Sequence, residues 1–187
     1  LVAGQPVTVA GSLAEASPAT GVDGQPPPIR LEVVRWDGQA ASFVGVLSAD
    51  GRAWSVDGVD LGAADGTAVA TVVAADVAGH VIRASRSWRV DATAPTVTLL
   101  LDGTPFPGAG VGESPAPGAE PALLNRTVIP RVVVSDPGGA APQPSLTLDG
   151  AGFAPGTPIA AEGDHLLLAR ATDCAGRETV VHAFFRL

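Results

Sequence analysis

The sequence predicts an all-β protein made of two similar sandwich domains in tandem, and three observations carry that prediction. Apolar and polar residues alternate in short runs, with turn signals about every 8–12 residues and no helical period, as in sandwiches and barrels. The turn at residues 76–79 (Asp-Val-Ala-Gly) recurs at 173–176 (Asp-Cys-Ala-Gly), an offset of 97 (173 − 76 = 97). A proline-containing segment, Val90 to Pro95, lies just before the midpoint of the 187-residue chain.

The first half contains six expected strands. Residues 29–36 show the pattern most clearly, because Ile29, Leu31 and Val33 alternate with Arg30, Glu32 and Val34. Asp37-Gly38, which follows, is a hairpin-turn signal. The expected strands cover residues 5–13, 29–36, 41–47, 54–56, 67–75 and 80–90.

The second half repeats this plan. At the offset of 97, Trp88 corresponds to Phe185, and at an offset of 99 (149 − 50 = 99) Asp50-Gly51 corresponds to Asp149-Gly150. Loops tolerate a length change of this size, so the order of the matches indicates an internal duplication. The matched aromatics, Trp88 with Phe185 and Trp54 with Phe153, are expected in the cores. The expected strands cover residues 95–101, 127–135, 144–149, 165–172 and 178–187, and residues 102–126 are expected to form a long Gly- and Pro-rich loop.

The segment Val90 to Pro95 therefore joins two units, residues 1–91 and 92–187, each slightly under 100 residues long. That length is typical of one immunoglobulin-like sandwich. Pro95 fixes its own φ and pushes Ala94 into an extended conformation, which favours a short, stiff linker. The predicted fold class is two tandem immunoglobulin-like β-sandwiches joined by such a linker.

The first unit is expected to begin at its second strand. Residues 7–11 align better with residues 132–136 than with residues 96–101. A missing first strand leaves a sheet edge unpaired, and proteins rarely leave a long edge uncovered. Three outcomes are open: a preceding part of the parent protein supplies the strand, another subunit inserts one, or residues 14–28 cover the edge.

Several motifs resemble the immunoglobulin-like repeat domains of large secreted and cell-surface bacterial proteins. The matching runs are Leu148-Asp149-Gly150, Gly156-Thr157-Pro158, residues 162–165 (Glu-Gly-Asp-His) and residues 171–176, and residues 90–95 resemble the boundary between repeats. The chain departs from the family at His80 and Arg177, where the repeats usually carry Asn. The resemblance implies a spacer, an adhesive stalk or an accessory module of a secreted enzyme.

The charge of the chain excludes some partners. Its net charge is −8, divided almost evenly between the two halves, and such an acidic surface repels a phosphate backbone, so we expect no nucleic-acid partner. No apolar run reaches the length of a membrane span. The single cysteine, Cys174, excludes an internal disulfide and a cysteine-based zinc site.

Three aspartates form the candidate metal site. In an immunoglobulin-like sandwich, the turns after the second and sixth strands lie at the end where the chain enters. In the second unit these turns carry Asp136 and Asp173, and both should face the linker and hence Asp91. Three carboxylates at one joint repel each other unless a cation neutralises them, and Ca²⁺ takes six to eight oxygen ligands. The alternative is that each Asp only bonds the backbone of its own turn.

Two aromatics, Trp36 and Phe184, are candidate ligand-binding residues. Phe184 should point away from the face that carries Phe185, because side chains alternate along a strand. An exposed ring could stack on a sugar or on a protein partner, whereas cover by residues 102–126 is the alternative for Phe184. His165 is expected to be a packed or loop histidine rather than a metal ligand. No catalytic triad, HExxH motif, phosphate loop or dinucleotide fingerprint occurs in the sequence.

The sequence thus predicts a non-catalytic module, with no enzyme activity, at the bacterial cell surface or secreted from the cell. Its role would be to space or present a binding element, with Ca²⁺ at the joint and with neighbouring domains or other copies as partners. A surface polysaccharide or protein is the expected ligand class. The alternatives are a carbohydrate-binding accessory module of a secreted enzyme and a subunit of a polymeric appendage.

Overall fold

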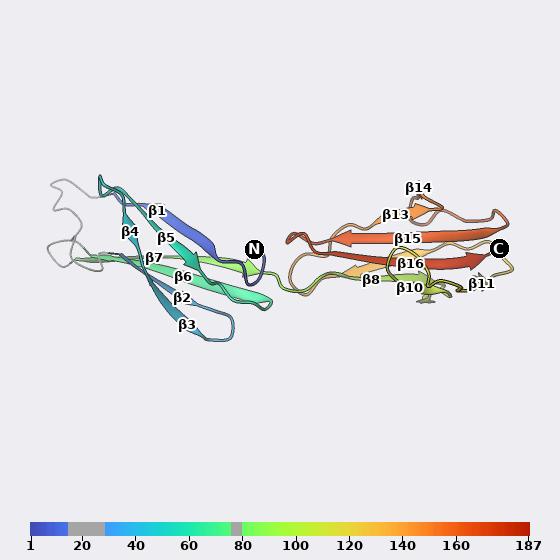
Figure 1. Ribbon diagram of the computed structural model, residues 1–187, viewed down its shortest axis with the longest axis horizontal. Coiled ribbons are helices and arrows are strands. Elements are labelled where there is room, and N and C mark those ends of the chain that lie inside the picture. Colours follow the sequence, from blue (N-terminus) through green and yellow to red (C-terminus); the bar gives the residue numbers. More distant parts are fainter. Residues whose placement is uncertain (15–28, 76–79) are drawn as a thin grey trace. The chain divides into compact units, whose positions relative to one another are not determined.

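The computed structural model describes residues 1–14, 29–75 and 80–187, and the expected turn at 76–79 and most of the expected loop at 14–28 lie outside this part. The described residues form strands, turns and irregular segments, with no helix among them. They divide into two compact units, Leu1–Ala92 and Thr93–Leu187. The protein is therefore all-β, with two tandem sandwiches of the immunoglobulin-like type (Figure 1).

The first unit packs a three-stranded sheet against a four-stranded one. The first sheet has the order β1 (Val7–Ser12), β5 (Ala53–Val59), β4 (Val46–Leu47). The second has the order β3 (Ala40–Val44), β2 (Ile29–Val34), β6 (Gly66–Ala75), β7 (Val81–Val90). The alternation predicted from the sequence is present, since Ile29, Leu31 and Val33 are fully buried in the core. Trp54 and Val56 face them from β5.

The second unit has the same two layers. One sheet has the order β12 (Arg131–Ser135), β8 (Thr96–Leu101), β9 (Thr104–Pro105). The other has the order β10 (Ala109–Val111), β16 (Glu178–Arg186), β15 (Asp164–Thr172), β13 (Ser145–Leu148), β14 (Ala151–Gly152). Phe185, Leu99 and Leu167 are among the largest fully buried side chains, and Phe106 packs on Phe185 with ring centroids 5.1 Å apart.

The segment 102–126 is more ordered than the expected loop. It contains β9, β10 and β11 (Ala122–Leu123), and β10 pairs antiparallel and β11 parallel with β16. The expectation of a plain loop was wrong because strands of two or three residues are too short to show an alternating pattern. Their pairing depends on the edge of β16, which the local sequence does not reveal.

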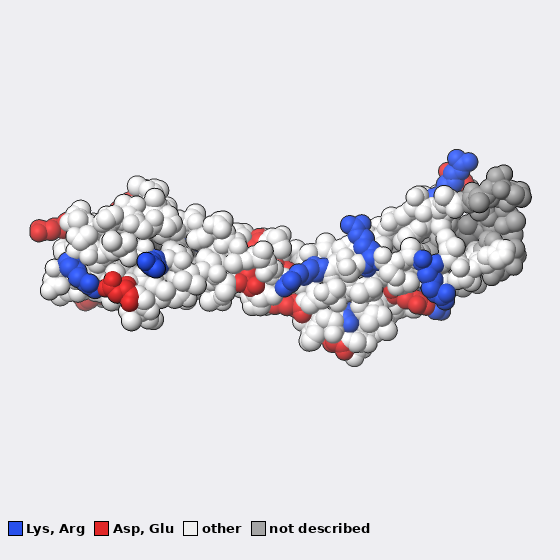
Figure 2. Space-filling model, turned by 180° about the vertical axis from the view of Figure 1, so that it is seen from behind, with Lys and Arg blue, Asp and Glu red and all other residues white. Residues whose placement is uncertain are grey.

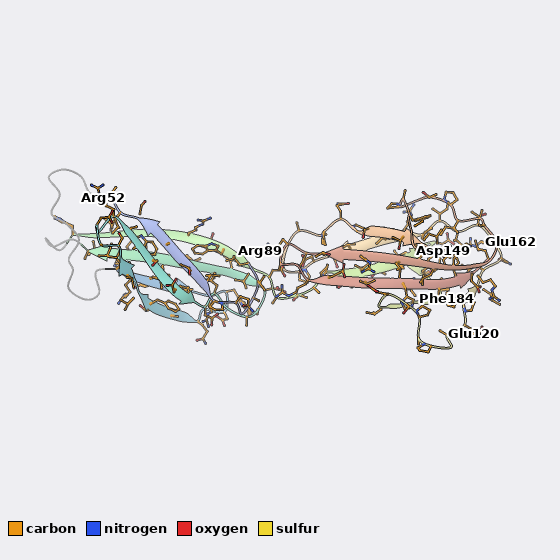
Figure 3. The ribbon with its side chains drawn as sticks, turned by 45° about the horizontal axis from the view of Figure 1, so that its top comes forward. Arg52, Arg89, Glu120, Asp149, Glu162 and Phe184 are labelled. Atoms are coloured by element: carbon orange, nitrogen blue, oxygen red, sulfur yellow. The ribbon has the colours of Figure 1, made fainter. Side chains whose placement is uncertain are left out.

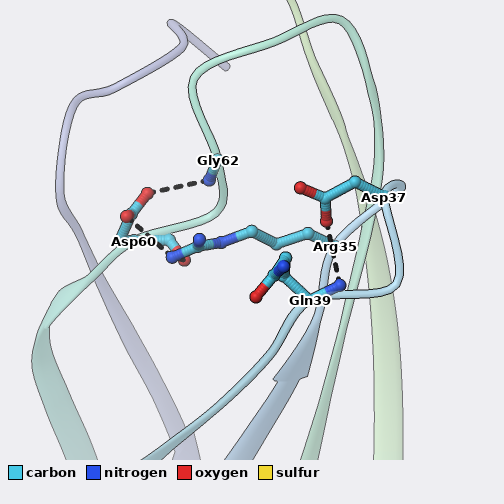
Figure 4. Close-up of polar contacts among 5 residues, drawn as sticks. All are labelled: Arg35, Asp37, Gln39, Asp60 and Gly62. Carbon is cyan, nitrogen blue, oxygen red and sulfur yellow. Dashed lines mark hydrogen bonds and ion pairs between the residues drawn. The ribbon is translucent and has the colours of Figure 1, made fainter.

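The Asp-Gly turns follow the sequence prediction. Asp149 (φ 51°) and Gly150 (φ 81°) both have the left-handed backbone that a tight two-residue hairpin requires, and they join β13 to β14. In the first unit, Asp37 accepts a hydrogen bond from the Gln39 amide at 2.9 Å and closes the hairpin between β2 and β3. Arg35 crosses from the same hairpin to Asp60, which lies 2.7 Å away and also caps the Gly62 amide (Figure 4).

Charged side chains are interspersed over both units on the face drawn in Figure 2. Arginines and acids also pair locally within each unit, as Arg35 does with Asp60 and Arg170 with Glu113. No helix of the described residues could cross a membrane.

Candidate metal centre

Asp136 and Asp173 occupy the two turns that the sequence selected, and both turns are of the same kind. Asp136 directly follows β12, and its Oδ1 accepts a hydrogen bond from the Gly138 amide at 2.9 Å. Asp173 directly follows β15, and its Oδ1 accepts from the amides of Ala175 and Arg177, both at 2.8 Å. An Asp that bonds the backbone two residues ahead stabilises a tight turn, so one oxygen of each carboxylate has a structural role.

The second oxygen of each carboxylate has no such role. Oδ2 of Asp136 and Oδ2 of Asp173 are both buried and accept no hydrogen bond from the described residues. The whole Asp173 residue is only 7% exposed. A carboxylate oxygen of Asp136 lies within 4.8 Å of one of Asp173. Burying two carboxylates this close to each other is costly without a compensating positive charge, so the pair offers oxygen ligands that suit a hard cation such as Ca²⁺.

Asp91 is the last residue but one of the first unit. The N-terminal segment fixes its backbone, because its amide donates to the Leu1 carbonyl at 2.9 Å and its carbonyl accepts from the Ala3 amide at 3.0 Å. The next amide, that of Ala92, donates to Asp65 at 2.5 Å. The residue is almost completely buried. The chain then continues as the segment that enters β8.

Chain connectivity places a limit on the distance from Asp91 to the pair in the second unit. Thr96, the first residue of β8, pairs with Ser135, which directly precedes Asp136. Thr96 is five positions after Asp91 in the sequence, and an extended chain of that length spans at most about 18 Å. A short segment of chain thus connects Asp91, in the first unit, to the strand of the second unit that pairs next to Asp136.

The two candidate ligand-binding aromatics lie in separate units and differ in exposure. Trp36 is 57% exposed, and its indole rests against Gly66, where a Cβ atom would lie 2.4 Å from the ring. Phe184, on β16, is only half-buried, and its amide donates to the Gly108 carbonyl at 3.2 Å (Figure 3). This contact joins residues 102–126 to the backbone of Phe184 and does not involve its ring. Trp36 is the more exposed of the two residues.

His165 makes a buried clamp that sequence reasoning missed. Its Nδ1 lies 2.8 Å from Oδ2 of Asp149, which sits in the turn after β13 (Figure 3), and its Nε2 lies 2.8 Å from the Ala161 carbonyl. Both partners are acceptors, so the ring satisfies them only when both nitrogens carry protons. Burial opposes the charged ring, but the hydrogen bonds to Asp149 and Ala161 outweigh it and raise the pKa of His165.

This clamp predicts that the second unit becomes less stable as the pH rises. The folded pKa of His165 lies above the ordinary value of about 6.5, so its stabilisation is complete below pH 6.5 and disappears as the pH rises through the folded pKa. Urea unfolding followed by circular dichroism at several pH values should show this decline. His165→Gln should flatten it, because a neutral amide has no charged form to stabilise. An equal slope in the wild type and in His165→Gln would contradict the clamp.

Comparison with known proteins gives distant structural likenesses only. No protein-family model matches the chain, and no curated protein sequence matches it. Among solved structures, the fibronectin(III)-like modules of Clostridium thermocellum CbhA align over 100% of this chain and 87% of theirs, with 17% identity and a TM-score of 0.38. A tetra-tandem repeat from the extending region of a large adhesion protein covers 99% of this chain, with 18% identity and a TM-score of 0.39.

A third likeness is to a Ca²⁺-stabilised adhesin with which an Antarctic bacterium binds ice. It covers 97% of this chain, with 20% identity and a TM-score of 0.39. The chain spans less than half of each of the two adhesin structures, 46% and 43%. Values this low assign no function to the chain, whereas the class of the protein follows from its own strands: two immunoglobulin-like sandwiches in tandem.

Proposed function

We propose that the chain is a non-catalytic structural module of a bacterial surface or secreted protein, and that Ca²⁺ bound at the joint stiffens its two sandwiches into a spacer. Asp91, Asp136 and Asp173 would be the protein's carboxylate ligands. The observation that carries the proposal is the pair of buried oxygens, Oδ2 of Asp136 and Oδ2 of Asp173, which receive no hydrogen bond from the described residues. The surface location rests on the motifs that resemble secreted bacterial repeats.

A stiff joint gives a spacer its reach. A chain of sandwiches connected by flexible linkers explores many shapes, whereas a cation held by ligands from both sides of a linker restricts them. Three carboxylates would supply part of the six to eight oxygens that Ca²⁺ takes, and backbone carbonyls and water would supply the rest. No reaction is assigned to these residues, because the proposed role of the ion is structural.

Calorimetric titration of the metal-free chain with Ca²⁺ tests this proposal. Heat of binding is expected for the wild type and should disappear in Asp91→Ala and in Asp173→Asn. Asp37→Asn is the matched control, because Asp37 caps a turn of the same kind but lies exposed on a hairpin. Small-angle scattering should show a wider range of shapes after chelation. If Ca²⁺ changes neither heat nor scattering, the aspartates are turn residues only.

Trp36 supports a second, weaker role in recognition. Its exposed indole is anchored on Gly66, and a ring held in this way loses little freedom when it stacks on a sugar or a protein side chain. Affinity electrophoresis in gels containing bacterial surface polysaccharide should show retardation of the wild type and none of Trp36→Ala. Equal mobility of the two proteins would remove Trp36 from the list of binding residues.

A further inference from the structure

The first unit has an open edge at β1. In its sheet, β1 pairs with β5 on one side and is the outer strand on the other, so that no described strand pairs with its free edge (Figure 1). In the second unit the corresponding strand, β12, pairs along its whole length with β8. Among its described residues, the first unit thus has no counterpart of β8, as the alignment of residues 7–11 with residues 132–136 predicts.

A groove of about 310 Å³ lies beside this edge, between β1 and β7. Its floor is mostly apolar and comes from both sheets, with Leu31 and Trp54 among its residues. Its rims come from β1 and β7. The lining residues are Thr8, Val9, Ala10, Leu31, Trp54 and Ala70, together with Val72, Ala84, Ser85, Arg86 and Trp88.

In the second unit, strand β8 occupies the place that corresponds to this groove. Its β8 pairs with β12 and also packs against β16, the counterpart of β7. The inward side chains of β8, namely Val97, Leu99 and Leu101, are all buried. An extended strand with an apolar residue at every second position therefore completes this kind of sandwich.

Exposure of the equivalent residues confirms that the first unit lacks this cover among its described residues. At the offset of 97, Ala84, Arg86 and Trp88 correspond to Val181, Ala183 and Phe185. The three residues of the second unit are buried, and Phe185 is 0% exposed. In the first unit, Ala84 and Arg86 are exposed and Trp88 is only half-buried. The register of β7 against β6 is the same as that of β16 against β15, since Ala74 pairs with Ile82 and Ala171 pairs with Thr179.

We propose that this groove binds an extended segment of a partner polypeptide, which pairs with β1 as β8 pairs with β12 in the second unit. The partner segment would resemble Thr96–Leu101 in its alternation of apolar residues. Arg86 occupies the position that corresponds to buried Ala183 in the second unit. Its guanidinium carbon lies 5.4 Å from the Trp88 ring centroid, and it makes no ion pair within the described residues. The partner segment would therefore also carry a carboxylate that pairs with Arg86. A second folded copy would not donate its own β8, since that strand already pairs with β12.

The partner gains from both kinds of contact in strand addition. Backbone hydrogen bonds to the edge of β1 contribute affinity whatever the sequence of the segment, and the apolar groove selects the side chains at alternate positions. The carboxylate opposite Arg86 contributes specificity, because Arg86 otherwise lies over an aromatic ring in a chain whose net charge is negative. This proposal does not depend on Ca²⁺ at the joint.

A synthetic peptide tests the proposal on the full chain. The probe is the sequence of Thr96–Leu101 with two glutamates at each end, and its control is a scrambled peptide of the same composition. Binding should shift the tryptophan emission to the blue, because all three tryptophans are in the first unit and Trp88 lines the groove. Hydrogen exchange should slow down at the β1 amides that face away from β5 when the peptide is bound.

Three variants make the test specific. Ala84→Arg fills the groove from an exposed position and should weaken peptide binding at least tenfold, whereas Ser87→Arg, exposed on the same strand but outside the groove, should not. Replacing the peptide's glutamates with arginines should weaken binding to the wild type but not to Arg86→Ala. The proposal is overturned if the peptide does not bind at millimolar concentration, if Ala84→Arg binds it as well as the wild type, or if the β1 amides that face away from β5 are already protected in the free chain.

Discussion

Phe185→Ala is expected to lower the free energy of unfolding of the second unit by about 3–5 kcal/mol, as truncation of a fully buried large aromatic does. Phe185 is completely buried, and the truncation leaves a cavity between Phe106, His165 and the strands that cover them. Urea unfolding followed by circular dichroism measures the loss.

Trp88→Ala is the matched comparison, because Trp88 has the same place in the duplicated plan. Its loss should cost less, about 1–2 kcal/mol, since Trp88 is only half-buried. Fluorescence separates the two units, because all three tryptophans lie in the first. The midpoint of the urea transition followed by fluorescence should shift to a lower urea concentration in Trp88→Ala and should be unchanged in Phe185→Ala. Equal losses in the two variants would show that Trp88 is covered in solution, and that outcome would also count against an open groove.

Asp173→Asn is expected to have opposite effects on stability with and without Ca²⁺. Asparagine keeps the Oδ1 acceptor for the amides of Ala175 and Arg177 and removes one negative charge from the pair with Asp136. In a chelator the variant should therefore be as stable as the wild type or more stable, by up to about 1 kcal/mol. With Ca²⁺ at about 100 times its Kd, the wild type should gain about 2.7 kcal/mol and the variant much less.

Thermal unfolding in EGTA and in Ca²⁺ measures this reversal. Asp37→Asn is again the control, and its difference from the wild type should be the same in both solutions. The proposed centre would be excluded if the stability of Asp173→Asn also differed from that of the wild type by the same amount in EGTA and in Ca²⁺. A reversal with no measurable heat of Ca²⁺ binding would instead indicate an effect of ionic strength, which NaCl at equal ionic strength would reproduce.

The strand pattern was largely predictable because it is local. The expected strands at 29–36, 67–75, 80–90 and 165–172 are present as β2, β6, β7 and β15, with their ends shifted by a residue or two. The expected strand at 127–135 begins only at Arg131, because Pro130 interrupts it and the earlier part contributes just an isolated bridge between Val128 and Ile159. Proline has no amide to donate to the ladder.

Within the candidate site, strand order predicted that two turns of the second unit lie close together. Asp136 and Asp173 follow strands that end on the same side of a sandwich, so their proximity could be inferred from strand order alone. That the two Oδ2 atoms accept no hydrogen bond could not be inferred from the sequence, because a turn motif does not show which carboxylate oxygen the backbone amides will use. Ca²⁺ at the joint with Asp91 remains a prediction.

The sequence by itself determined the elements that depend on neighbouring residues: the alternating strands, the Asp-Gly hairpin at Asp149, and the duplication that makes two units from one plan. Only the tertiary structure decided the features that depend on residues far apart in the chain. Among these are the pairing of β10 and β11 with β16, the contact of His165 with Asp149, and the contrast between buried Phe185 and half-exposed Trp88. The reason is physical, because burial and pairing depend on which strand lies opposite, and β8 lies over one member of the duplicated pair while no described strand lies over the other.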